Sequence, residues 1–330
     1  MTTFPRLHGR KVLVTGAGGF IGSHLAERLT RDGAQVRAMV HYNALGSRGW
    51  LDHSSIANEM EIVAGDVTDA DSARAACAGV EVVFHLAALI AIPYSYAAPR
   101  SYARTNLEGT INLLQGARDA GVARFIQTST SEVYGTARIV PIPEAHPLQG
   151  QSPYAASKIA SDKMAEAFHL SFGLPVTILR PFNTFGPRQS SRAVIPTVIR
   201  QLLAGDEVRI GNTAPTRDFN PVPNTVDAFV ATAASDRAIG ATVHFGSGRE
   251  VSVGDMIAAV GALLGRTPRI VTEAVRVRKG GSEVERLIAD NSLAREMFGW
   301  APGVSFEDGL AATIEWIRAQ PAGEASRYVV

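Results

Sequence analysis

The sequence is poor in cysteine and has no excess of charge of either sign. One cysteine, Cys77, occurs in 330 residues, so no disulfide can form within the chain and nothing indicates an oxidising compartment. The 32 Lys+Arg balance 31 Asp+Glu for a formal net charge of +1, which argues against the broad basic field that binds nucleic acid or anionic lipid. We expect no nucleic-acid or membrane partner, no metal, and anions held by a few local arginines.

The sequence also lacks a hydrophobic run long enough to span a bilayer. Its most apolar stretch, residues 80–92, is interrupted by Glu81 and His85 and falls short of the ~20 residues that a membrane helix needs. The apolar run after Arg10 and Lys11 is only as long as a strand, unlike that of a signal peptide. These observations predict a cytoplasmic protein, and the chain length predicts about two domains of roughly 100–200 residues each.

Apolar runs of strand length alternate with stretches of helical spacing through the first half of the chain. The spacing predicts helices over 20–31, 69–77, 101–120 and 153–172. Strands are predicted over 11–15, 35–40, 61–64, 81–86, 124–129 and 175–180. Strands separated by helices of this length form right-handed βαβ units, so we expect an α/β fold with a doubly wound parallel sheet over residues 1–180.

Proline and glycine interrupt this alternation after Arg180. We expect a smaller, mixed C-terminal domain over residues 181–330 that binds the substrate. A helix at 225–235 and a strand at 242–245 predict that the chain returns to the main sheet within residues 225–250. The segments 251–264, 291–298 and 306–319 are expected to complete this second part.

Three glycines stand between the first expected strand and helix. Residues 15–22 read T-G-A-G-G-F-I-G, with Gly16, Gly19 and Gly22 spaced as G-x-x-G-x-x-G. Gly16 permits the tight turn, Gly19 lets the backbone approach a pyrophosphate, and Gly22 lets helix and strand pack closely. The helix begins with Phe20 and Ile21, so its positive N-terminus faces the anion. The pattern predicts dinucleotide binding by a Rossmann fold.

The end of the second strand lacks the carboxylate that usually selects NAD. A carboxylate there binds the ribose 2′-hydroxyl and repels the 2′-phosphate of NADP, whereas this chain has Val40 and His41. His41 and Arg48 would welcome a phosphate, so the residues themselves leave NAD and NADP open. After the third strand, Asp66 either accepts from the adenine amino group or caps a turn. The cofactor contacts predicted after the third and fourth strands are Asp66, Val67, Leu86, Ala87 and Ala88.

Tyr154 and Lys158 stand four residues apart in the predicted helix 153–172, so both project from one face. A lysine ammonium lowers the pKa of a neighbouring phenol, which can then take a proton from a sugar hydroxyl as hydride leaves the same carbon. A Tyr and a Lys at this spacing are common on exposed helices and do not by themselves indicate catalysis. They indicate it here because the glycine loop precedes them and because the residues T-S-T-S-E at 128–132 offer a further hydroxyl that can share the proton.

Together these motifs resemble the extended short-chain dehydrogenase/reductases that act on nucleotide sugars. The resemblance extends over nearly the whole chain. Its motifs are those at 15–22, H-L-A-A at 85–88, T-S-T-S-E-V-Y-G at 128–135, Y-A-A-S-K at 154–158, R-P-F-N at 180–183 and T-R-D-F at 216–219. The resemblance implies tightly held NAD, a UDP-sugar substrate, and a homodimer formed through helices 101–120 and 153–172.

The resemblance also implies roles for individual residues. Thr130, Tyr154 and Lys158 are expected to be catalytic, the last two also beside the cofactor, with Glu132 needed only in some reactions. Pro181 is implied to lie near the nicotinamide. The implied substrate contacts are Thr130, Ser131, Asn183, Arg188, Arg192, Arg217 and Arg278. Arginine suits a diphosphate because its planar fork meets two oxygens at once, while a surface salt bridge is the alternative for each.

Three reactions of such enzymes begin alike, with removal of the 4-hydroxyl proton to give a 4-keto sugar. Glu132 favours a 4,6-dehydratase, in which a carboxylate removes the C5 proton, although Ser131 replaces the acidic residue of the dTDP-glucose dehydratases. The decarboxylases carry R-K-P-D where this chain reads L-I-A-D at 287–290, which disfavours decarboxylation.

The loop at 186–193 carries two arginines, Arg188 and Arg192, where one would serve the diphosphate. The second suggests a carboxylate at C6 of the sugar. With the resemblance to UDP-glucuronate 4-epimerases of antibiotic biosynthesis, it favours conversion of UDP-glucuronate to UDP-galacturonate, with 4,6-dehydration as the alternative. A non-catalytic dinucleotide-binding protein is a more distant alternative, against which the intact Tyr154 and Lys158 argue.

Overall fold

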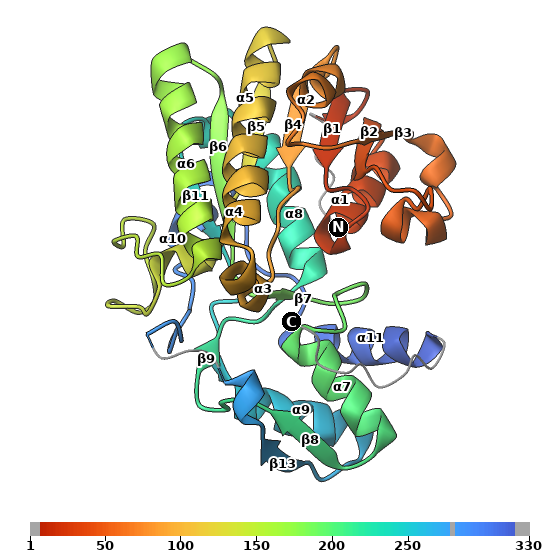
Figure 1. Ribbon diagram of the computed structural model, residues 1–330, viewed down its shortest axis with the longest axis vertical. Helices are drawn as coiled ribbons and strands as arrows, with labels where there is room; N and C mark the ends of the chain where they lie inside the picture. Colours follow the sequence, from red (N-terminus) through yellow and green to blue (C-terminus); the bar gives the residue numbers. More distant parts are fainter. Residues whose placement is uncertain (1–6, 278–280, 321–330) are drawn as a thin grey trace.

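The computed structural model of the protein, which describes residues 7–277 and 281–320, has two lobes, the larger built on a seven-stranded parallel sheet (Figure 1). The strand order is β11-β6-β5-β4-β1-β2-β3. The strands are β1 (Lys11–Thr15), β2 (Gln35–His41), β3 (Glu61–Gly65), β4 (Val82–His85), β5 (Arg124–Thr128), β6 (Val176–Pro181) and β11 (Thr242–Phe245). The doubly wound parallel sheet predicted from the sequence is confirmed.

Helices cover both faces of this sheet. One face carries α1 (Phe20–Arg31), α8 (Val222–Ala233) and α10 (Ser292–Phe298). The other carries α2 (Ala70–Cys77), α5 (Gly109–Asp119) and α6 (Pro153–Phe172). Each face buries its own apolar core, with Phe84 against Phe229 on the first and Leu113 near Phe168 on the second. Such burial of strands from both sides explains their nearly continuous apolar sequences.

The ends of the long helix α6 follow from its flanking residues. The Ser152 side chain accepts a hydrogen bond from the Ala155 backbone N–H, and Pro153 occupies the first helical turn, where its missing N–H costs nothing. Gly173, at φ +68°, ends the helix in a left-handed conformation that glycine adopts without strain. These signals place α6 as the sequence predicted.

The helix expected over 101–120 is interrupted. The structure has α4 (Pro99–Tyr102), a π-helical segment η4 (Ala103–Glu108) and then α5, in a continuous helical path. Within η4, the buried Asn106 side chain donates to the Leu89 carbonyl and the Ser157 hydroxyl and accepts from the Leu89 N–H. These bonds connect the segment to the loop after β4 and to α6, beside the expected catalytic face.

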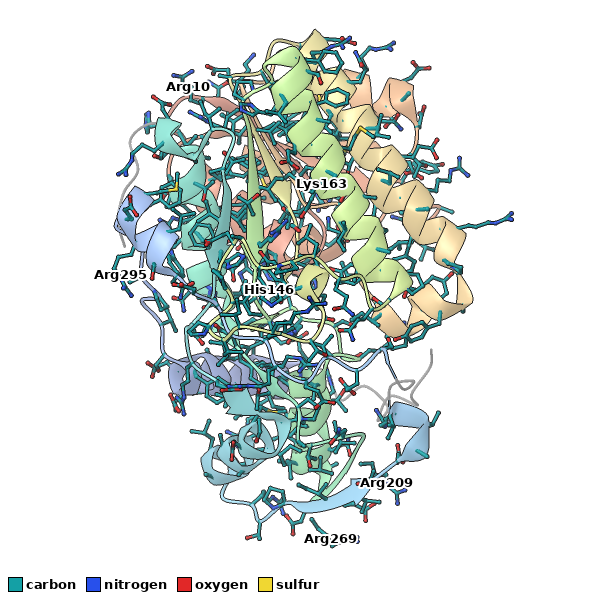
Figure 2. The ribbon with its side chains drawn as sticks, turned by 90° about the vertical axis from the view of Figure 1, so that its left-hand side faces the viewer. Arg10, His146, Lys163, Arg209, Arg269 and Arg295 are labelled. Carbon is teal, nitrogen blue, oxygen red and sulfur yellow. The ribbon has the colours of Figure 1, made fainter. Side chains whose placement is uncertain are left out.

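The smaller lobe packs α7 (Val194–Ala204), α9 (Val253–Leu264) and α11 (Phe306–Ala319) around an apolar core that includes Leu202, Met256 and Leu310. Arg209 and Arg269 mark its far end (Figure 2), where β8 (Glu207–Ile210) pairs with β13 (Arg269–Thr272). Two further strand pairs connect the lobes: β7 (Thr184–Phe185) with β10 (Asn220–Pro221), and β9 (Thr216–Arg217) with β12 (Val251–Ser252).

The short helical segments complete the description of residues 7–277 and 281–320. They are α3 (Ile92–Ala97), η2 (Gly49–His53), η3 (Ala57–Glu59), η5 (Ser131–Tyr134), η6 (Asp236–Ala238) and η7 (Ala274–Arg276). Of the helices that the structure describes, none combines the length and the apolar character needed to cross a membrane.

Candidate active site

The glycine loop after β1 is shaped by close backbone contacts. A Cβ atom on Gly22 would lie 2.2 Å from the Gly16 carbonyl oxygen, and one on Gly16 would lie 2.9 Å from the Ala87 nitrogen. Helix α1, which follows, has no side-chain cap at its N-terminus among the described residues and no acidic residue in its first turn. Its first N–H groups are therefore available to an anion, as a dinucleotide pyrophosphate requires.

The other residues expected at the cofactor lie at the carboxyl ends of neighbouring strands. Val67 follows β3, the 86–88 segment follows β4, and Pro181 ends β6, all at the same edge of the parallel sheet. Asp66 uses its Oδ1 to accept from both the backbone and the hydroxyl of Thr68, at 2.8 and 2.9 Å. Asp66 thus caps a turn, as one of its two sequence interpretations has it, and its backbone position follows β3.

A buried histidine joins the strands where the order reverses, between β1 and β4. His85 Nδ1 lies 2.8 Å from Thr15 Oγ1, and its Nε2 lies 3.1 Å from Thr110 Oγ1. Thr110 donates its hydroxyl to a backbone carbonyl one turn back, so His85 donates from Nε2 and accepts at Nδ1. Thr15 Oγ1 in turn accepts from the Leu86 and Ala87 N–H groups. The network fixes the loop against which the glycine loop packs.

The expected catalytic residues come together on one face of α6 and at the end of β5. Tyr154 and Lys158 are both buried, and Tyr154 is hydrogen-bonded to Thr130. Lys158 Nζ donates to the Thr128 carbonyl at 2.6 Å. Thr130 also accepts from the Glu132 N–H and so begins η5, which carries the buried Ser131 and Glu132 side chains.

Burial and neighbouring charges shift the pKa values of both members of this pair. Burial raises the pKa of Tyr154, and the negative charges of Glu132 and Asp162 raise it further, while the Thr130 hydrogen bond acts in the opposite direction. Burial also lowers the pKa of Lys158, against the influence of Asp162. Because the ammonium is directed at a carbonyl, the phenol's surroundings are dominated by desolvation rather than by a lysine charge.

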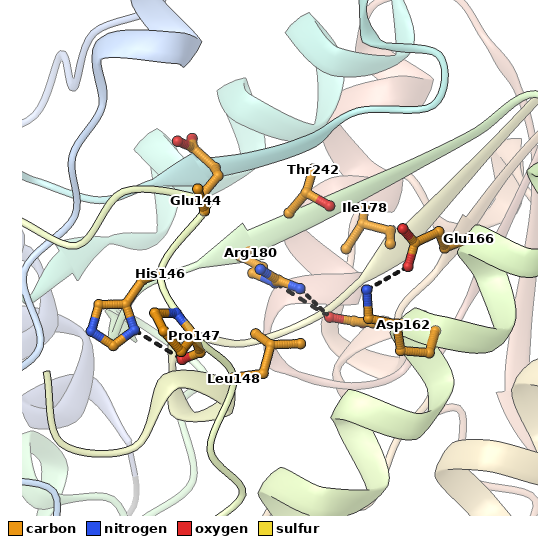
Figure 3. Close-up of a pocket in the computed structure, with 11 residues that line it drawn as sticks. Glu144, His146, Pro147, Leu148, Asp162, Glu166, Ile178, Arg180 and Thr242 are labelled. Atoms are coloured by element: carbon orange, nitrogen blue, oxygen red, sulfur yellow. Dashed lines mark hydrogen bonds and ion pairs between the residues drawn. The ribbon is translucent and has the colours of Figure 1, made fainter. Parts of the chain in front are cut away.

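A buried polar network lies close to the expected catalytic residues, and Figure 3 shows its Arg180–Asp162 pair. Arg180 donates to Asp162 Oδ2 from Nη2 and Nε, at 3.0 and 3.3 Å, and to the Tyr134 hydroxyl at 2.6 Å. Asp162 Oδ2 also accepts from the Ser129 hydroxyl, and Tyr134 contacts His244 Nε2. The network joins α6, β5, η5, β6 and β11. It therefore holds the elements that carry the catalytic side chains in one arrangement.

A cavity of about 440 Å³ opens beside this network, between α6 and residues 144–148 (Figure 3). Asp162 and Arg180 line it, together with the Lys163–Glu166 ion pair. Its lining contains neither Tyr154 nor any residue of the glycine loop, so this hollow is separate from the expected reaction centre.

Two of the expected substrate arginines are already engaged by carboxylates. Arg188, at φ +70°, donates to the Glu27 carboxylate at 2.9 Å and to the Ser23 hydroxyl at 3.1 Å, both on α1. This is the salt-bridge alternative for Arg188, which pairs with the buried Glu27 and holds the 186–193 loop against α1. Arg217 is also buried, with its guanidinium 3.4 Å from Glu283 and donating to the Thr216 carbonyl.

Arg192 is different. Its side chain is exposed, and its guanidinium makes no hydrogen bond or ion pair with residues 7–277 or 281–320. Burial raises the pKa of the Tyr102 phenol, and the nearby positive charge of Arg192 acts against that rise. The Tyr102 ring meets the Tyr154 ring edge-on, with centroids 6.2 Å apart. Arg192 is therefore an exposed charge close enough to act on Tyr102, whose ring packs against that of Tyr154.

Several buried polar atoms near the site have no hydrogen-bond partner in the described part of the chain. Among them are Asn183 Oδ1, in the loop after β6, and Thr128 Oγ1, at the end of β5. Buried polar atoms are normally paired, so these positions fit contacts with a bound molecule. Arg278, the remaining expected substrate residue, lies outside the described residues.

Sequence reasoning missed the polar residues that support the site. Asp162 follows Lys158 by four residues, a spacing that places it on the same helix face and was available as a signal. Asp218 lies in the T-R-D-F motif but was given no role. It is fully buried and accepts four hydrogen bonds, from Ser247 N and Oγ, Gly248 N and Ala289 N. No local pattern shows such partners, which are distant in sequence.

Comparison with known proteins gives consistent matches. A family model described as GDP-mannose 4,6 dehydratase matches residues 13–313. The UDP-glucose 4-epimerase of Mycolicibacterium smegmatis is 34% identical over 314 residues, covering 93% of this chain and 98% of that protein. The chain is thus similar both to a 4-epimerase and to a family of 4,6-dehydratases.

Two solved structures extend the comparison. DesIV, a dTDP-glucose 4,6-dehydratase from Streptomyces venezuelae with NAD and TYD bound, matches with a TM-score of 0.85 at 32% identity, covering 93% of this chain and 97% of that one. The UDP-glucuronic acid 4-epimerase from Bacillus cereus, in complex with UDP-glucuronic acid and NAD, matches with a TM-score of 0.84 at 27% identity, covering 93% and 99%.

Proposed function

Because the chain belongs to the GDP-mannose 4,6-dehydratase-like family, within the extended short-chain dehydrogenase/reductase group of nucleotide-sugar epimerases and dehydratases, we propose that it is a 4-epimerase converting UDP-glucuronate to UDP-galacturonate. NAD is its cofactor. We assign cofactor binding to residues 1–180, with the return at 225–250, and the nucleotide sugar to 181–330. The observation that carries the choice of a uronate is the exposed Arg192, whose charge acts on Tyr102, the neighbour of Tyr154.

The proposed reaction divides between the cofactor and the side chains. NAD, when bound, would accept a hydride from C4 of the sugar and return it to the other face of C4 after the 4-keto sugar has turned. Tyr154 takes the proton of the 4-hydroxyl and later gives it back. Since burial raises the pKa of this phenol, the negative phenolate needs a donor, and the Thr130 hydroxyl is the hydrogen-bonding group in place.

Arg192 is proposed to pair with the C6 carboxylate of the uronate. Such a pair holds the carboxylate out of the alignment that loss of carbon dioxide requires. A neutral hexose offers no charge to Arg192. The side chain is therefore expected to distinguish uronates from hexoses.

The 4,6-dehydratase alternative rests on one observation. Glu132 is buried in η5, directly after Thr130, where a carboxylate can act as a base toward the sugar. Product analysis separates the two reactions. A product of unchanged mass inverted at C4 supports epimerization, and loss of water from a hexose supports dehydration.

The test compares UDP-glucuronate with UDP- and GDP-hexoses by mass spectrometry and sugar NMR. Arg192→Ala is expected to lower kcat/KM on UDP-glucuronate roughly 10²-fold, through loss of a charge-assisted hydrogen bond, and to change turnover of the matching hexose far less. Arg209→Ala, an exposed arginine at the far end of the smaller lobe, is the control. Equal losses on both substrates, or unchanged UDP-glucuronate beside a dehydrated hexose, would contradict the proposal.

We also infer a homodimer through α6 and the helical path over residues 101–120. Leu170 and Phe172 support this, because these large apolar side chains at the end of α6 are 76% and 54% exposed. Light scattering on the purified protein checks the mass. A monomer at micromolar concentration would contradict the inferred interface.

A further inference from the structure

The structure offers an answer to the missing carboxylate at the end of β2. This strand ends at His41, and the chain nevertheless uses NAD. In Rossmann folds the adenosine ribose lies at this strand end, where a carboxylate excludes the 2′-phosphate of NADP. The discriminating charge must therefore come from another segment.

Both basic side chains near this strand end lie close to an aspartate from outside β2. His41 is near enough to Asp66 to contribute to lowering the pKa of that carboxyl. Arg48 Nε donates to Asp52 Oδ1 at 2.8 Å. Asp52 Oδ2 accepts from the Ser47 hydroxyl and from the Arg48 N–H, both at 2.9 Å. Both oxygens of Asp52 are thus in use, and Arg48 is neutralised.

The Arg48–Asp52 pair is built onto the phosphate loop. The Trp50 N–H, within η2, donates to the Gly18 carbonyl at 2.9 Å. A Cβ atom on Gly49 would lie 2.3 Å from that same oxygen, so the two backbones touch. The pair therefore stands between the end of β2 and the glycine loop, on the ribose side of the cofactor site.

We propose that Asp52 is the residue that makes this protein select NAD over NADP. It acts in two ways: it occupies the guanidinium that a 2′-phosphate would bind, and its own charge repels that phosphate. Asp52 thereby does from η2 what a strand-end carboxylate does in other dinucleotide-binding folds. This inference depends on NAD binding and not on which sugar is turned over.

The experiment measures which nucleotide the protein retains. Purified protein is incubated with equal concentrations of NAD and NADP and desalted, and the bound nucleotides are extracted and quantified by mass spectrometry. Asp52→Ala is expected to raise the retained NADP:NAD ratio roughly tenfold or more, because Arg48 becomes free to form a charge-assisted bond to phosphate. Asp52→Asn, which keeps the shape and removes the charge, is expected to move the ratio in the same direction.

Two further variants separate this role from a general charge effect. Glu59→Ala removes one exposed negative charge from the neighbouring η3 and is expected to leave the ratio unchanged. Adding Arg48→Ala to Asp52→Ala is expected to bring the ratio back toward that of the unmodified protein. An unchanged ratio in both Asp52 variants, or an equal change in Glu59→Ala, would overturn the proposal. Sugar specificity is read in separate assays, so failure of either proposal is seen independently.

Discussion

The buried Asp162–Arg180 pair gives a sharp test of what holds the catalytic elements together. The two side chains are 1% and 5% exposed, and Arg180 donates to Asp162 twice. Replacing Asp162 with Asn keeps the shape and removes the charge, which leaves a buried guanidinium without a counter-ion. Breaking one partner of such a pair costs about 3–5 kcal/mol, so we expect a loss of that size in the free energy of unfolding.

The assay is urea unfolding followed by far-UV circular dichroism, with Glu166→Gln as the matched control. Glu166 pairs with Lys163 on the same helix, but these side chains are 45% and 60% exposed, and such a surface pair contributes under about 1 kcal/mol. Replacing both buried partners by Asp162→Leu with Arg180→Met is expected to cost less than Asp162→Asn alone. If Asp162→Asn costs no more than Glu166→Gln, the pair does not stabilise the site as argued.

Three further predictions concern the loop, a histidine and the catalytic phenol. Gly22→Ala places a Cβ 2.2 Å from the Gly16 carbonyl oxygen and is expected to abolish nucleotide retention, whereas Gly303→Ala, with open space around it, is not. Burial lowers the pKa of His85 from 6.5 to about 3. Its contribution to the free energy of unfolding is therefore complete above pH 6.5 and falls by up to about 1.4 kcal/mol per pH unit as the pH drops toward 3. His85→Asn should flatten that dependence in urea titrations, and an unchanged slope would contradict it. Tyr154→Phe is expected to lower turnover by roughly 10²–10⁴-fold without shifting the unfolding midpoint.

The larger lobe was predictable because its signals are local. Apolar runs of strand length alternate with helical spacing, as βαβ units require. The structure places β1, α1 and α6 at the expected residues, and Ser152 and Gly173 bound α6. In the smaller lobe, α7 was not predicted, because Pro196 is one of the prolines and glycines that interrupt the alternation after Arg180. The structure puts this proline in the first turn of α7, where the N–H groups have no partner within the helix.

The site was predictable to the extent that sequence motifs mark it. The glycine loop and the Tyr154–Lys158 spacing identified the loop after β1 and the face of α6 that form the site. The surroundings of each side chain, however, depend on tertiary contacts. Burial raises the pKa of Tyr154, which the spacing does not show, and Asp52 stands eleven residues beyond the strand end where a carboxylate was sought. Such contacts arise only when the segments fold together.

The attachment of the 186–193 loop to α1 has a consequence for protein engineering. Arg188 holds Ser23 and Glu27, and the Pro187 carbonyl lies 3.1 Å from the His24 ring nitrogen Nε2. Transplanting this loop alone into a related enzyme would leave Arg188 without its carboxylate, while the host's own α1 would meet a foreign loop. The unit that must be exchanged to transfer sugar preference is therefore the loop together with the 23–27 face of the nucleotide helix.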